Sequence, residues 1–506
     1  MLTEKQFSQM RNTSATSFVV LVALLCLQPG HAGCEYPPDA SGHVTIPNSK
    51  TSLYFNAFKD CTNLKSVTIP DSVTTMYNGV FSGCSNLTSV TLPNNLKVIS
   101  KLTFDGCTSL TSLTIPTSVT TIGDDAFSNS GLQFLDLPRN VTNLGENAFR
   151  NCANLTSVNL GSIRSIKRGT FQNCPSLTNV TIPETVEYIQ EYAFAGCASL
   201  SSMAIPDKTK LIARFAFQGC SSLPSVTIPV NVTNIQGFAF ENCHSLTSVT
   251  LPENLLMIRE GAFRGCTSLK SVTIPDKVNL IERYAFDGCT SLESVTLPKS
   301  TTVIPAYSFR SCTSLKSVII PDNVTIIQIY AFRGCASLMS VSFGKLLQRI
   351  GSFAFSQTGL TSVTLPNEIN EVGDFAFSEC TNLMSVTGLT ANSLGQFVFK
   401  DCSNLTSVTI GSTHNSNIRP NIFEGTSSKL RCDKLCGGGS ISCNPTCGVE
   451  GCSLTAMQEL TCPGSGDCQE CPKRAGSSDE EAFTSSASGL FPWSSAFTML
   501  AVVLFF

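Results

Sequence analysis

The sequence predicts a β-rich solenoid of about sixteen coils, each 22 to 24 residues long, whose short strands stack into a long parallel sheet. Phenylalanine recurs at this interval along most of the chain, the same apolar frame surrounds each copy, and polar and apolar residues alternate within the frame. A fixed period of this length is typical of solenoids, because one coil cannot bury its apolar side alone. The recurring residues are Phe58, Phe81, Phe104, Phe127, Phe149, Phe171, Phe194, Phe217, Phe240, Phe263, Phe286, Phe309, Phe332, Phe355, Phe377, Phe399 and Phe423.

One coil illustrates the elements that the frame predicts. Ser112–Ile115 alternates polar and apolar residues, which indicates a half-buried strand with its two apolar side chains pointing inward. Pro116 lacks an amide hydrogen, so we expect it to end the strand at a corner. Val119 and Ile122 then bury a second, shorter extended segment, and Gly123–Asp125 forms a turn. Each coil is therefore predicted to contain a strand, a corner, a short extended segment and a turn.

The frame L-x-x-V-x-[IL]-P, preceded by A-F-x-x-C, resembles the leucine-rich repeats of the BspA-like, Treponema-type surface proteins. The resemblance spans Tyr54 to Phe423, and it implies a leucine-rich-repeat solenoid at 58–430. It also implies an extracellular or cell-surface protein with a role in adhesion or in host or matrix binding. Two coils depart from the frame, because Ser130 and Thr358 replace the cysteine and one residue is missing after each.

Fourteen cysteines occupy the same position of the frame and are predicted to form a column. A disulfide or metal ladder is one interpretation, and small buried thiols are the other. Side chains of in-register neighbours run parallel rather than toward each other, and Ser130 and Thr358 substitute for the cysteine, so we favour buried thiols. These residues are Cys61, Cys84, Cys107, Cys152, Cys174, Cys197, Cys220, Cys243, Cys266, Cys289, Cys312, Cys335, Cys380 and Cys402.

Eight further cysteines cluster in a Gly- and Ser-rich segment, 431–474, which predicts a C-terminal disulfide-rich module with four bridges. Only one pair has the C-x2-C spacing of a zinc site, so a metal site is the weaker interpretation. The eight are Cys432, Cys436, Cys443, Cys447, Cys452, Cys462, Cys468 and Cys471. At the other end, 33–57 is predicted to cap the first coil, with Cys34 as a candidate partner of Cys61.

The N-terminal residues 1–32 are predicted to be a signal peptide. Lys5 and Arg11 precede the apolar run Phe18–Leu27, which is too short to span a bilayer. Small residues follow, so cleavage is expected after Ala32. The disulfide-rich module predicted at 431–474 is consistent with export.

The C-terminal sequence predicts a glycosylphosphatidylinositol anchor. Residues 475–489 supply the attachment site and a polar spacer, and the apolar tail 490–506 would be removed on anchoring. The best attachment candidates are Ser477 and Gly476, with Ser485–Ser488 as the fallback. A retained membrane helix is the alternative, but no basic stop signal follows the tail.

The repeat region also holds seven N-x-S/T sequons, which become candidate glycosylation sites beside a secretory signal. Some overlap positions that the frame predicts to be buried, so full occupancy is not expected. They start at Asn86, Asn140, Asn154, Asn179, Asn231, Asn323 and Asn404.

Catalysis and nucleic-acid binding are not expected. The net charge is −3, which gives no electrostatic footprint for nucleic acid. None of the four histidines lies in a catalytic motif, and neither a P-loop, a G-x-S-x-G nor an H-E-x-x-H sequence is present. We therefore expect no enzymatic activity and no cofactor.

The remaining hypothesis is a surface adhesion or recognition protein that binds an extracellular protein or glycan through the solenoid, with the lipid anchor holding it at the membrane. Its oligomeric state is left open. Residues that break the regularity are candidates for reading the partner, and these are Phe134, Asp136, Arg259, Glu260, Glu282, Arg283, Tyr284 and Arg349.

Two alternatives differ in kind. Outward-facing Ser and Thr ladders could meet ice or a repetitive polysaccharide surface, although β-branched threonine also simply suits an exposed strand. The ladder pairs are Ser66/Thr68, Ser89/Thr91, Ser225/Thr227, Ser248/Thr250, Ser271/Thr273, Ser294/Thr296, Ser362/Thr364 and Ser407/Thr409. A passive surface-coat protein is the other, because exposed Trp and Tyr look scarce.

Overall fold

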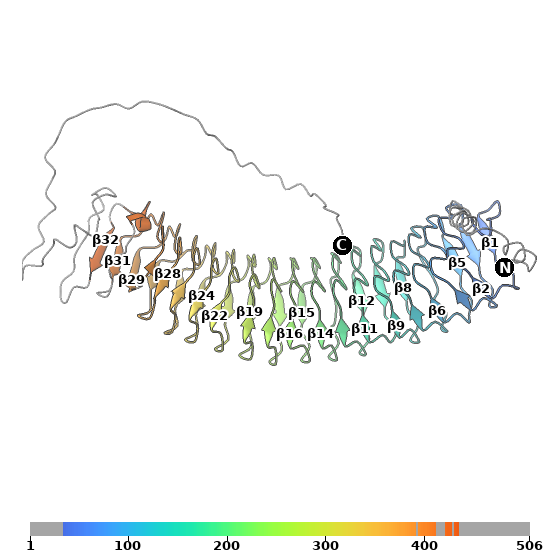
Figure 1. Ribbon diagram of the computed structural model, residues 1–506, viewed down its shortest axis with the longest axis horizontal. Helices are drawn as coiled ribbons and strands as arrows, with labels where there is room; N and C mark the ends of the chain where they lie inside the picture. Colours follow the sequence, from blue (N-terminus) through green and yellow to red (C-terminus); the bar gives the residue numbers. More distant parts are fainter. Residues whose placement is uncertain (1–33, 391–392, 411–419, 428–429, 435–506) are drawn as a thin grey trace, which may run out of the picture. The chain divides into compact units, whose positions relative to one another are not determined.

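The computed structural model describes residues 34–390, 393–410, 420–427 and 430–434, and only the backbone of 410, 420 and 431–434. The predicted signal peptide, the attachment site, the tail and the disulfide module beyond residue 434 lie outside the described residues. Coils follow one another along the chain from blue to orange in Figure 1. The structure confirms a solenoid of about sixteen turns with parallel sheets.

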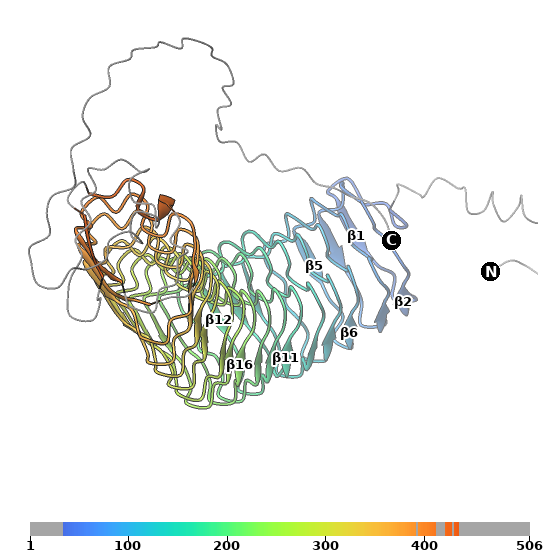
Figure 2. The ribbon, with the colours of Figure 1, turned by 60° about the vertical axis from the view of Figure 1, so that its left-hand side comes forward.

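Each coil contributes strands to two columns, which Figure 2 shows on different sides of the coils. The first strand column carries the Ser-Val-Thr segments and comprises β1 (His43–Thr45), β3 (Ser66–Thr68), β5 (Ser89–Thr91), β8 (Phe134–Asp136), β10 (Ser157–Asn159), β12 (Asn179–Thr181), β15 (Ser225–Thr227), β17 (Ser248–Thr250), β19 (Ser271–Thr273), β21 (Ser294–Thr296), β23 (Ser317–Ile319), β25 (Ser340–Ser342), β27 (Ser362–Thr364), β29 (Ser385–Leu389), β31 (Ser407–Ile410) and β32 (Arg431–Lys434).

The second strand column consists of two-residue strands that follow the proline corner. It comprises β2 (Ser52–Leu53), β4 (Thr75–Met76), β6 (Val98–Ile99), β7 (Thr121–Ile122), β9 (Asn143–Leu144), β11 (Ser165–Ile166), β13 (Tyr188–Ile189), β14 (Leu211–Ile212), β16 (Asn234–Ile235), β18 (Met257–Ile258), β20 (Leu280–Ile281), β22 (Val303–Ile304), β24 (Ile326–Ile327), β26 (Arg349–Ile350), β28 (Glu371–Val372) and β30 (Ser393–Leu394). Like positions pair in register, as Ser225 does with Ser248.

The first strand column is interrupted in two coils, which corrects one prediction. Ser112–Ile115 is not a strand, although its alternation of exposed and buried side chains is as predicted. In the other interrupted coil a lone bridge joins Asn179 to Ser202. Leu113 and Met203 stand there in place of the usual valine, and β-branched residues suit a strand better.

The core is a column of stacked phenylalanine rings. Sixteen consecutive ladder phenylalanines from Phe58 to Phe399 are fully buried, and Phe423 packs partly buried at the end. Neighbouring ring centroids lie 5.2 to 5.6 Å apart, as in the pairs Phe58–Phe81 and Phe399–Phe423. The predicted phenylalanine ladder is therefore confirmed, and each ring packs on the coils before and after it.

The repeat cysteines form a column of buried free thiols, as expected. Thirteen of them are unpaired, and each thiol bonds across coils to a backbone carbonyl, as Cys243 does to Phe217 at 3.2 Å. Ser130 and Thr358 replace the thiol with a hydroxyl, and Thr358 donates to the carbonyl of Phe355. A covalent ladder is absent from the described residues.

The two ends of the described solenoid extend the predicted repeat region. Cys34 forms a disulfide with Cys61, which confirms that pairing. β1 and β2 pair with the next coil, so part of the predicted cap 33–57 is itself a coil. At the other end a 3-10 helix, η2 (Pro420–Phe423), precedes β32, which adds a parallel strand at the start of the predicted module. Among the described residues, no helix is long and apolar enough to cross a membrane.

Candidate recognition surface

Sixteen coils contain two positions with positive φ, one on either side of the ladder phenylalanine, and the coil of Phe423 has only the second. The position two residues after the phenylalanine is filled mainly by Gly, Asn and Asp, the residues that adopt this conformation most readily. Its members are Asp60, Gly83, Gly106, Asn129, Asn151, Asn173, Gly196, Gly219, Asn242, Gly265, Gly288, Ser311, Gly334, Gln357, Glu379, Asp401 and Gly425.

The position two residues before the phenylalanine is different. In the first six coils it is filled by Asn, Gly, Leu or Asp, but in nine of the next ten coils it is aromatic, at φ values of 56° to 60°. Gly261 is the one exception, and the ring of Phe238 covers the space where its side chain would be. We call these nine residues the aromatic column: Tyr192, Phe215, Phe238, Tyr284, Tyr307, Tyr330, Phe353, Phe375 and Phe397.

The aromatic column is a stack of partly exposed rings on the turn that follows the second strand column. Successive ring centroids lie 4.6 to 5.2 Å apart, as in Tyr284–Tyr307 and Phe215–Phe238. A left-handed residue with a side chain costs about 1–2 kcal/mol, whereas an aromatic pair contributes about 0.5–1.5 kcal/mol. The two terms nearly cancel, so coil stability alone does not account for the aromatic column.

Cationic side chains lie beside these rings. The Arg214 guanidinium is 4.7 Å from the Phe215 centroid, and that of Arg310 is 5.1 Å from the Tyr307 centroid. At the C-terminal end, the Lys400 ammonium is 5.1 Å from the Phe397 centroid. Tyr and Arg are the side chains most enriched in the energetically dominant centres of protein interfaces.

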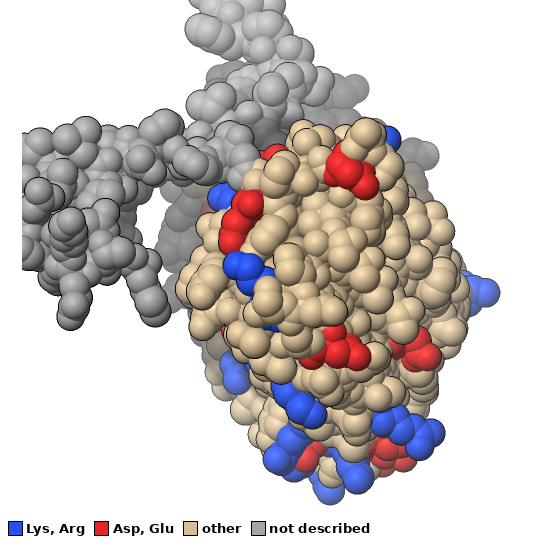
Figure 3. Space-filling view, turned by 90° about the vertical axis from the view of Figure 1, so that its right-hand side faces the viewer, with Lys and Arg blue, Asp and Glu red and all other residues tan. Residues whose placement is uncertain are grey.

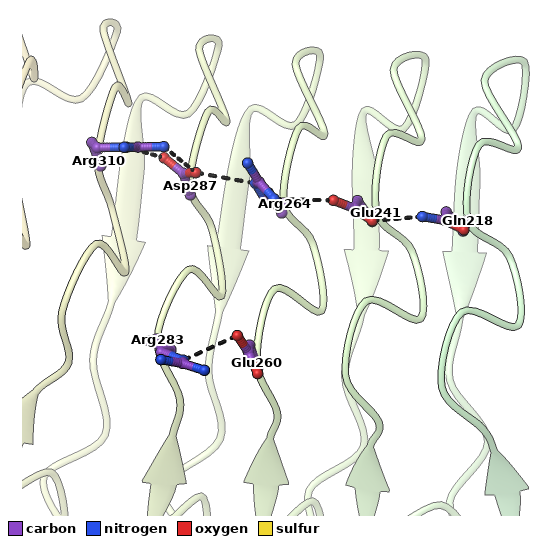
Figure 4. A network of polar contacts seen from close by, with 7 residues as sticks. All are labelled: Gln218, Glu241, Glu260, Arg264, Arg283, Asp287 and Arg310. Atoms are coloured by element: carbon purple, nitrogen blue, oxygen red, sulfur yellow. Dashed lines mark hydrogen bonds and ion pairs between the residues drawn. The ribbon is translucent and has the colours of Figure 1, made fainter. Parts of the chain in front are cut away.

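A ladder of interacting polar side chains, one residue after the core phenylalanine, runs through five successive coils (Figure 4). Gln218 donates to Glu241 at 2.7 Å, and Arg264 lies 3.4 Å from Glu241 and 3.3 Å from Asp287. Arg310 binds both oxygens of Asp287 at 2.8 and 2.9 Å. We call these five residues the charge ladder. Its geometry holds the guanidinium groups in place against the rings.

The charged turns that the sequence singled out also pair across coils. Arg259 lies 3.0 Å from Glu282. Arg283 lies 3.0 Å from Glu260, as Figure 4 shows. Further along the second strand column, Arg349 in β26 lies 3.0 Å from Glu371 in β28. Exposed pairs of this kind contribute little to stability, about 0–1 kcal/mol each. These residues are therefore paired across coils, and of the three arginines Arg283 also lies 6.0 Å from the Tyr284 ring centroid.

A depression of about 590 Å³ lies next to the aromatic column, where the second strand column is interrupted between β20 and β22. The amide of Glu282 donates to the carbonyl of Ile258, and the amide of Gln328 donates to that of Ile304. Pro305 occupies the same position and has no amide hydrogen, so the corresponding bond to Ile281 cannot form. The interruption was not predicted from the sequence.

Phe134 and Asp136, the other predicted reader residues, lie apart from the aromatic column. Both are exposed in β8, where Asp136 accepts a hydrogen bond from the Asn159 amide at 2.8 Å. A shallow depression of about 300 Å³ surrounds them on the first strand column. The structure thus separates the predicted readers into two surfaces.

All seven sequon asparagines are exposed, while the residue after each asparagine is buried, as Leu87 and Val141 are, so the sequons do overlap buried positions of the frame. Six lie at corners, either two residues after a repeat cysteine or two after a proline, and Asn179 lies in β12. The Asn86 side-chain amide donates to the Thr62 carbonyl in the preceding coil at 2.7 Å. None of the seven belongs to the aromatic column.

The described residues contain no group of three or more His, Cys, Asp and Glu side chains able to hold a metal ion. His43 bonds to Ser66 and Thr45, and His244 bonds to the Gly265 carbonyl, so both serve local structure. Figure 3, viewed from the right-hand side of Figure 1, shows acidic and basic side chains interspersed over a largely uncharged surface. Such a surface offers no field of one sign.

The repeat frame and the two strand columns match a known family. A family model described as the BspA type leucine rich repeat region matches residues 40–156, 142–259, 187–316, 233–352 and 302–430. The chain belongs to the BspA-type leucine-rich repeat family. BspA-type repeats thus account for most of the chain, and no enzymatic family is indicated. None of the curated proteins matches the chain.

Solved structures with BspA-type architecture are similar to this chain. A leucine-rich repeat protein from Bacteroides ovatus is 25% identical, with a TM-score of 0.50, over 78% of this chain and 92% of that chain. The Treponema pallidum leucine rich repeat protein is 32% identical, with a TM-score of 0.30, over 31% of this chain and 77% of that chain. A leucine rich cell surface protein from Faecalibacterium prausnitzii is 29% identical, with a TM-score of 0.34, over 56% and 78%.

Proposed function

We propose that this chain is a cell-surface recognition or adhesion protein that binds an extracellular protein through the aromatic column and the arginines beside it. The proposal rests on one observation: nine partly exposed aromatic side chains stand at left-handed positions that Gly or Asn would occupy at lower cost. Repeat proteins use their extended faces to bind partners. The predicted signal peptide and glycosylphosphatidylinositol anchor would display this face outside the cell.

A protein partner suits the aromatic column better than a glycan does. The rings stack on one another, so their faces are largely covered and their edges face outward, whereas a sugar that stacks on an aromatic residue needs its face. Ring edges with neighbouring guanidinium groups fit the mixed aromatic and charged centre of a protein interface.

The positions of the predicted glycosylation sites also favour the aromatic column as the binding surface. If the sequons carry glycans, these would project from the corners and from Asn179 in the first strand column, leaving the aromatic column bare. The alternative of ice or polysaccharide binding by the Ser/Thr ladders is less well supported, because that column is interrupted at Ser112 and Met203 and carries Phe134 and Ile319 on its outer side. A passive coat would not require the aromatic column.

The test is a binding screen of the secreted chain, ending before the anchor site, against an array of matrix and cell-surface proteins. Tyr307→Asn combined with Tyr330→Asn removes two central rings, and asparagine tolerates the left-handed backbone. Leu102→Asn is the matched control, since Leu102 has the same φ sign at the same coil position outside the aromatic column. The proposal predicts at least one specific interaction that the double variant loses and the control retains.

A screen with no specific interaction would contradict a recognition role. An interaction that survives the double substitution would place binding on another face, with the first strand column as the next candidate. Thermal unfolding of the wild type, the double variant and the Leu102→Asn control distinguishes a loss of binding from a loss of folding.

A further inference from the structure

The charge ladder alternates acid and base until Arg310 and then breaks its own pattern. Glu241, Arg264, Asp287 and Arg310 alternate in sign from coil to coil. The next coil presents Arg333 at the same position, where alternation calls for a carboxylate. Two guanidinium groups therefore stand in adjacent coils without an acid between them.

Arg333 makes no ion pair within the described part of the chain, and its Nε is buried without a hydrogen-bond partner. Arg310, by contrast, is held by both carboxylate oxygens of Asp287. The following coil offers Ser356 at this position, and the adjoining turns carry Ile329 and Ser352, so the neighbouring coils supply no acid there.

The Arg333 side chain is embedded in the aromatic column. Its guanidinium carbon lies 5.5 Å from the Tyr330 centroid and 5.8 Å from the Phe353 centroid. Two ring contacts restrict the side chain, so less entropy is lost when its N–H groups bind an acceptor. A planar guanidinium fork matches the two oxygens of a carboxylate.

We propose that Arg333 is the anchor for an acidic segment of the partner protein, with a partner carboxylate completing the alternation that the charge ladder leaves unfinished. This rests on the proposed function and names the chemistry of its ligand. Arg310 adds long-range attraction, while Tyr330 and Phe353 supply apolar contact to the residues flanking the acid. Acidic side chains next to aromatic or aliphatic ones are the expected recognition sequence.

The first test measures fluorescence anisotropy of a labelled octaglutamate peptide with the secreted chain at low ionic strength. The wild-type chain is expected to bind it, and Arg333→Gln is expected to bind at least about tenfold more weakly, the loss of one charge-assisted pair. Arg283→Gln is the matched control, because Arg283 also borders the aromatic column but is already paired with Glu260. Equal binding by the wild type and Arg333→Gln, or no binding by the wild type, overturns the proposal.

Arg333→Glu separates binding from folding. The new carboxylate would lie one coil after Arg310, whereas Asp287 lies one coil before it. The thermal unfolding midpoint should therefore stay the same or rise, while peptide binding is lost. A variant that keeps peptide binding contradicts the anchor role. A heparin oligosaccharide serves as the competing probe, and tighter, Arg333-dependent binding of heparin than of octaglutamate would assign the site to a sulfated glycan instead and overturn the protein partner.

The two proposals fail in different ways. If the Tyr307→Asn and Tyr330→Asn double variant loses its array partner while Arg333→Gln keeps both the partner and the peptide, the aromatic column binds without an anchoring acid, and only this inference fails. If the wild-type chain binds the peptide through Arg333 but no protein on the array, the recognition function fails and the anion site remains.

Discussion

The Cys84 thiol donates a hydrogen bond to the carbonyl of Phe58, one coil earlier, at a sulfur–oxygen distance of 2.9 Å. The same bond recurs along the described solenoid, with distances of up to 3.3 Å between each thiol and the preceding coil's phenylalanine carbonyl. Each thiol therefore adds a second hydrogen bond to a carbonyl beside the ring stack that already accepts one from the backbone of its own coil, as the Phe58 carbonyl does from Cys61. The cysteine column is a set of hydrogen bonds, and its chemistry leads to the first prediction.

Alkaline pH is expected to destabilise the solenoid steeply. Burial raises the pKa of Cys84, Cys197, Cys243 and Cys335 from 9.0 to about 12. Between these two values the unfolded chain loses the thiol proton and the folded chain keeps it, so the free energy of unfolding falls as pH rises above 9. Each such thiol contributes a slope of about −1.4 kcal/mol per pH unit.

Urea unfolding from pH 8 to pH 10.5 measures this slope. Cys243→Ser is the matched variant, because a hydroxyl is a hydrogen-bond donor like the thiol but does not ionise in this range. Its slope should be shallower than that of the wild type by the contribution of one thiol. Identical slopes, or rapid reaction of the native thiols with a thiol reagent at pH 8, would refute the buried-thiol account.

Two phenylalanines in one coil should respond very differently to truncation. Phe240 is fully buried in the core stack, whereas Phe238, two residues earlier, is half-buried in the aromatic column. Phe240→Ala is expected to cost about 3–5 kcal/mol of unfolding free energy. Phe238→Asn should cost less than about 1 kcal/mol, because the backbone strain that it relieves offsets the lost stacking. Comparable costs in urea unfolding would show that the aromatic column is a second core.

Pro305 is predicted to be a weak point of the second strand column, which is also interrupted between β4 and β6 and between β9 and β11. Pro305→Gln restores an amide hydrogen next to the Ile281 carbonyl, as Gln328 has next to the Ile304 carbonyl. One regained hydrogen bond is worth about 1 kcal/mol, so the urea midpoint should rise. The depression beside the aromatic column should also narrow. Pro298→Gln, at an ordinary corner, is the control, and a rise in that variant alone would contradict the assignment.

The repeat frame predicts the core because it is set by local patterning. Phe240 and Cys243 recur with the same neighbours in nearly every coil, so their burial and stacking follow from period and polarity. The missing strand at Ser112–Ile115 could not be predicted from this patterning. Strand pairing there depends on how the backbone of the adjacent coil, which is one residue shorter, is presented. Leu135 lies in a strand despite having leucine at the same position, so side-chain identity alone does not decide it.

The aromatic column is visible in the sequence as a repeating aromatic position, but its significance depends on the backbone conformation at that position. Tyr307 and Tyr330 stand at a position that is variable along the chain, so the frame treats it as unconstrained. The informative signal is a run of aromatic residues at the 23-residue period where Gly and Asn precede them. What makes the run unusual is the positive φ, which no residue pattern reveals. The missing acid opposite Arg333 likewise becomes visible only when the ladder partners are known.

The predicted lipid anchor makes a direct cellular prediction. Phosphatidylinositol-specific phospholipase C should release the protein from intact cells, because cleavage of the glycolipid leaves no apolar tail on the chain. Changing both attachment candidates, Ser477 and Gly476, to bulky residues should lower surface display. Retention of the protein after the enzyme, with residues 490–506 detected by mass spectrometry, would mean a retained tail.

Hydroxyl-radical footprinting of the chain, alone and bound to the protein recovered from the array, tests the recognition surface most directly, because it reads aromatic side chains. Tyr284, Tyr307 and Tyr330 should become protected on binding, while the exposed Tyr54 and Phe55 at the other end should stay reactive. Buried Phe240 should be unreactive in both states. Protection confined to the Ser and Thr residues of the first strand column, with the aromatic column unchanged, would contradict the account.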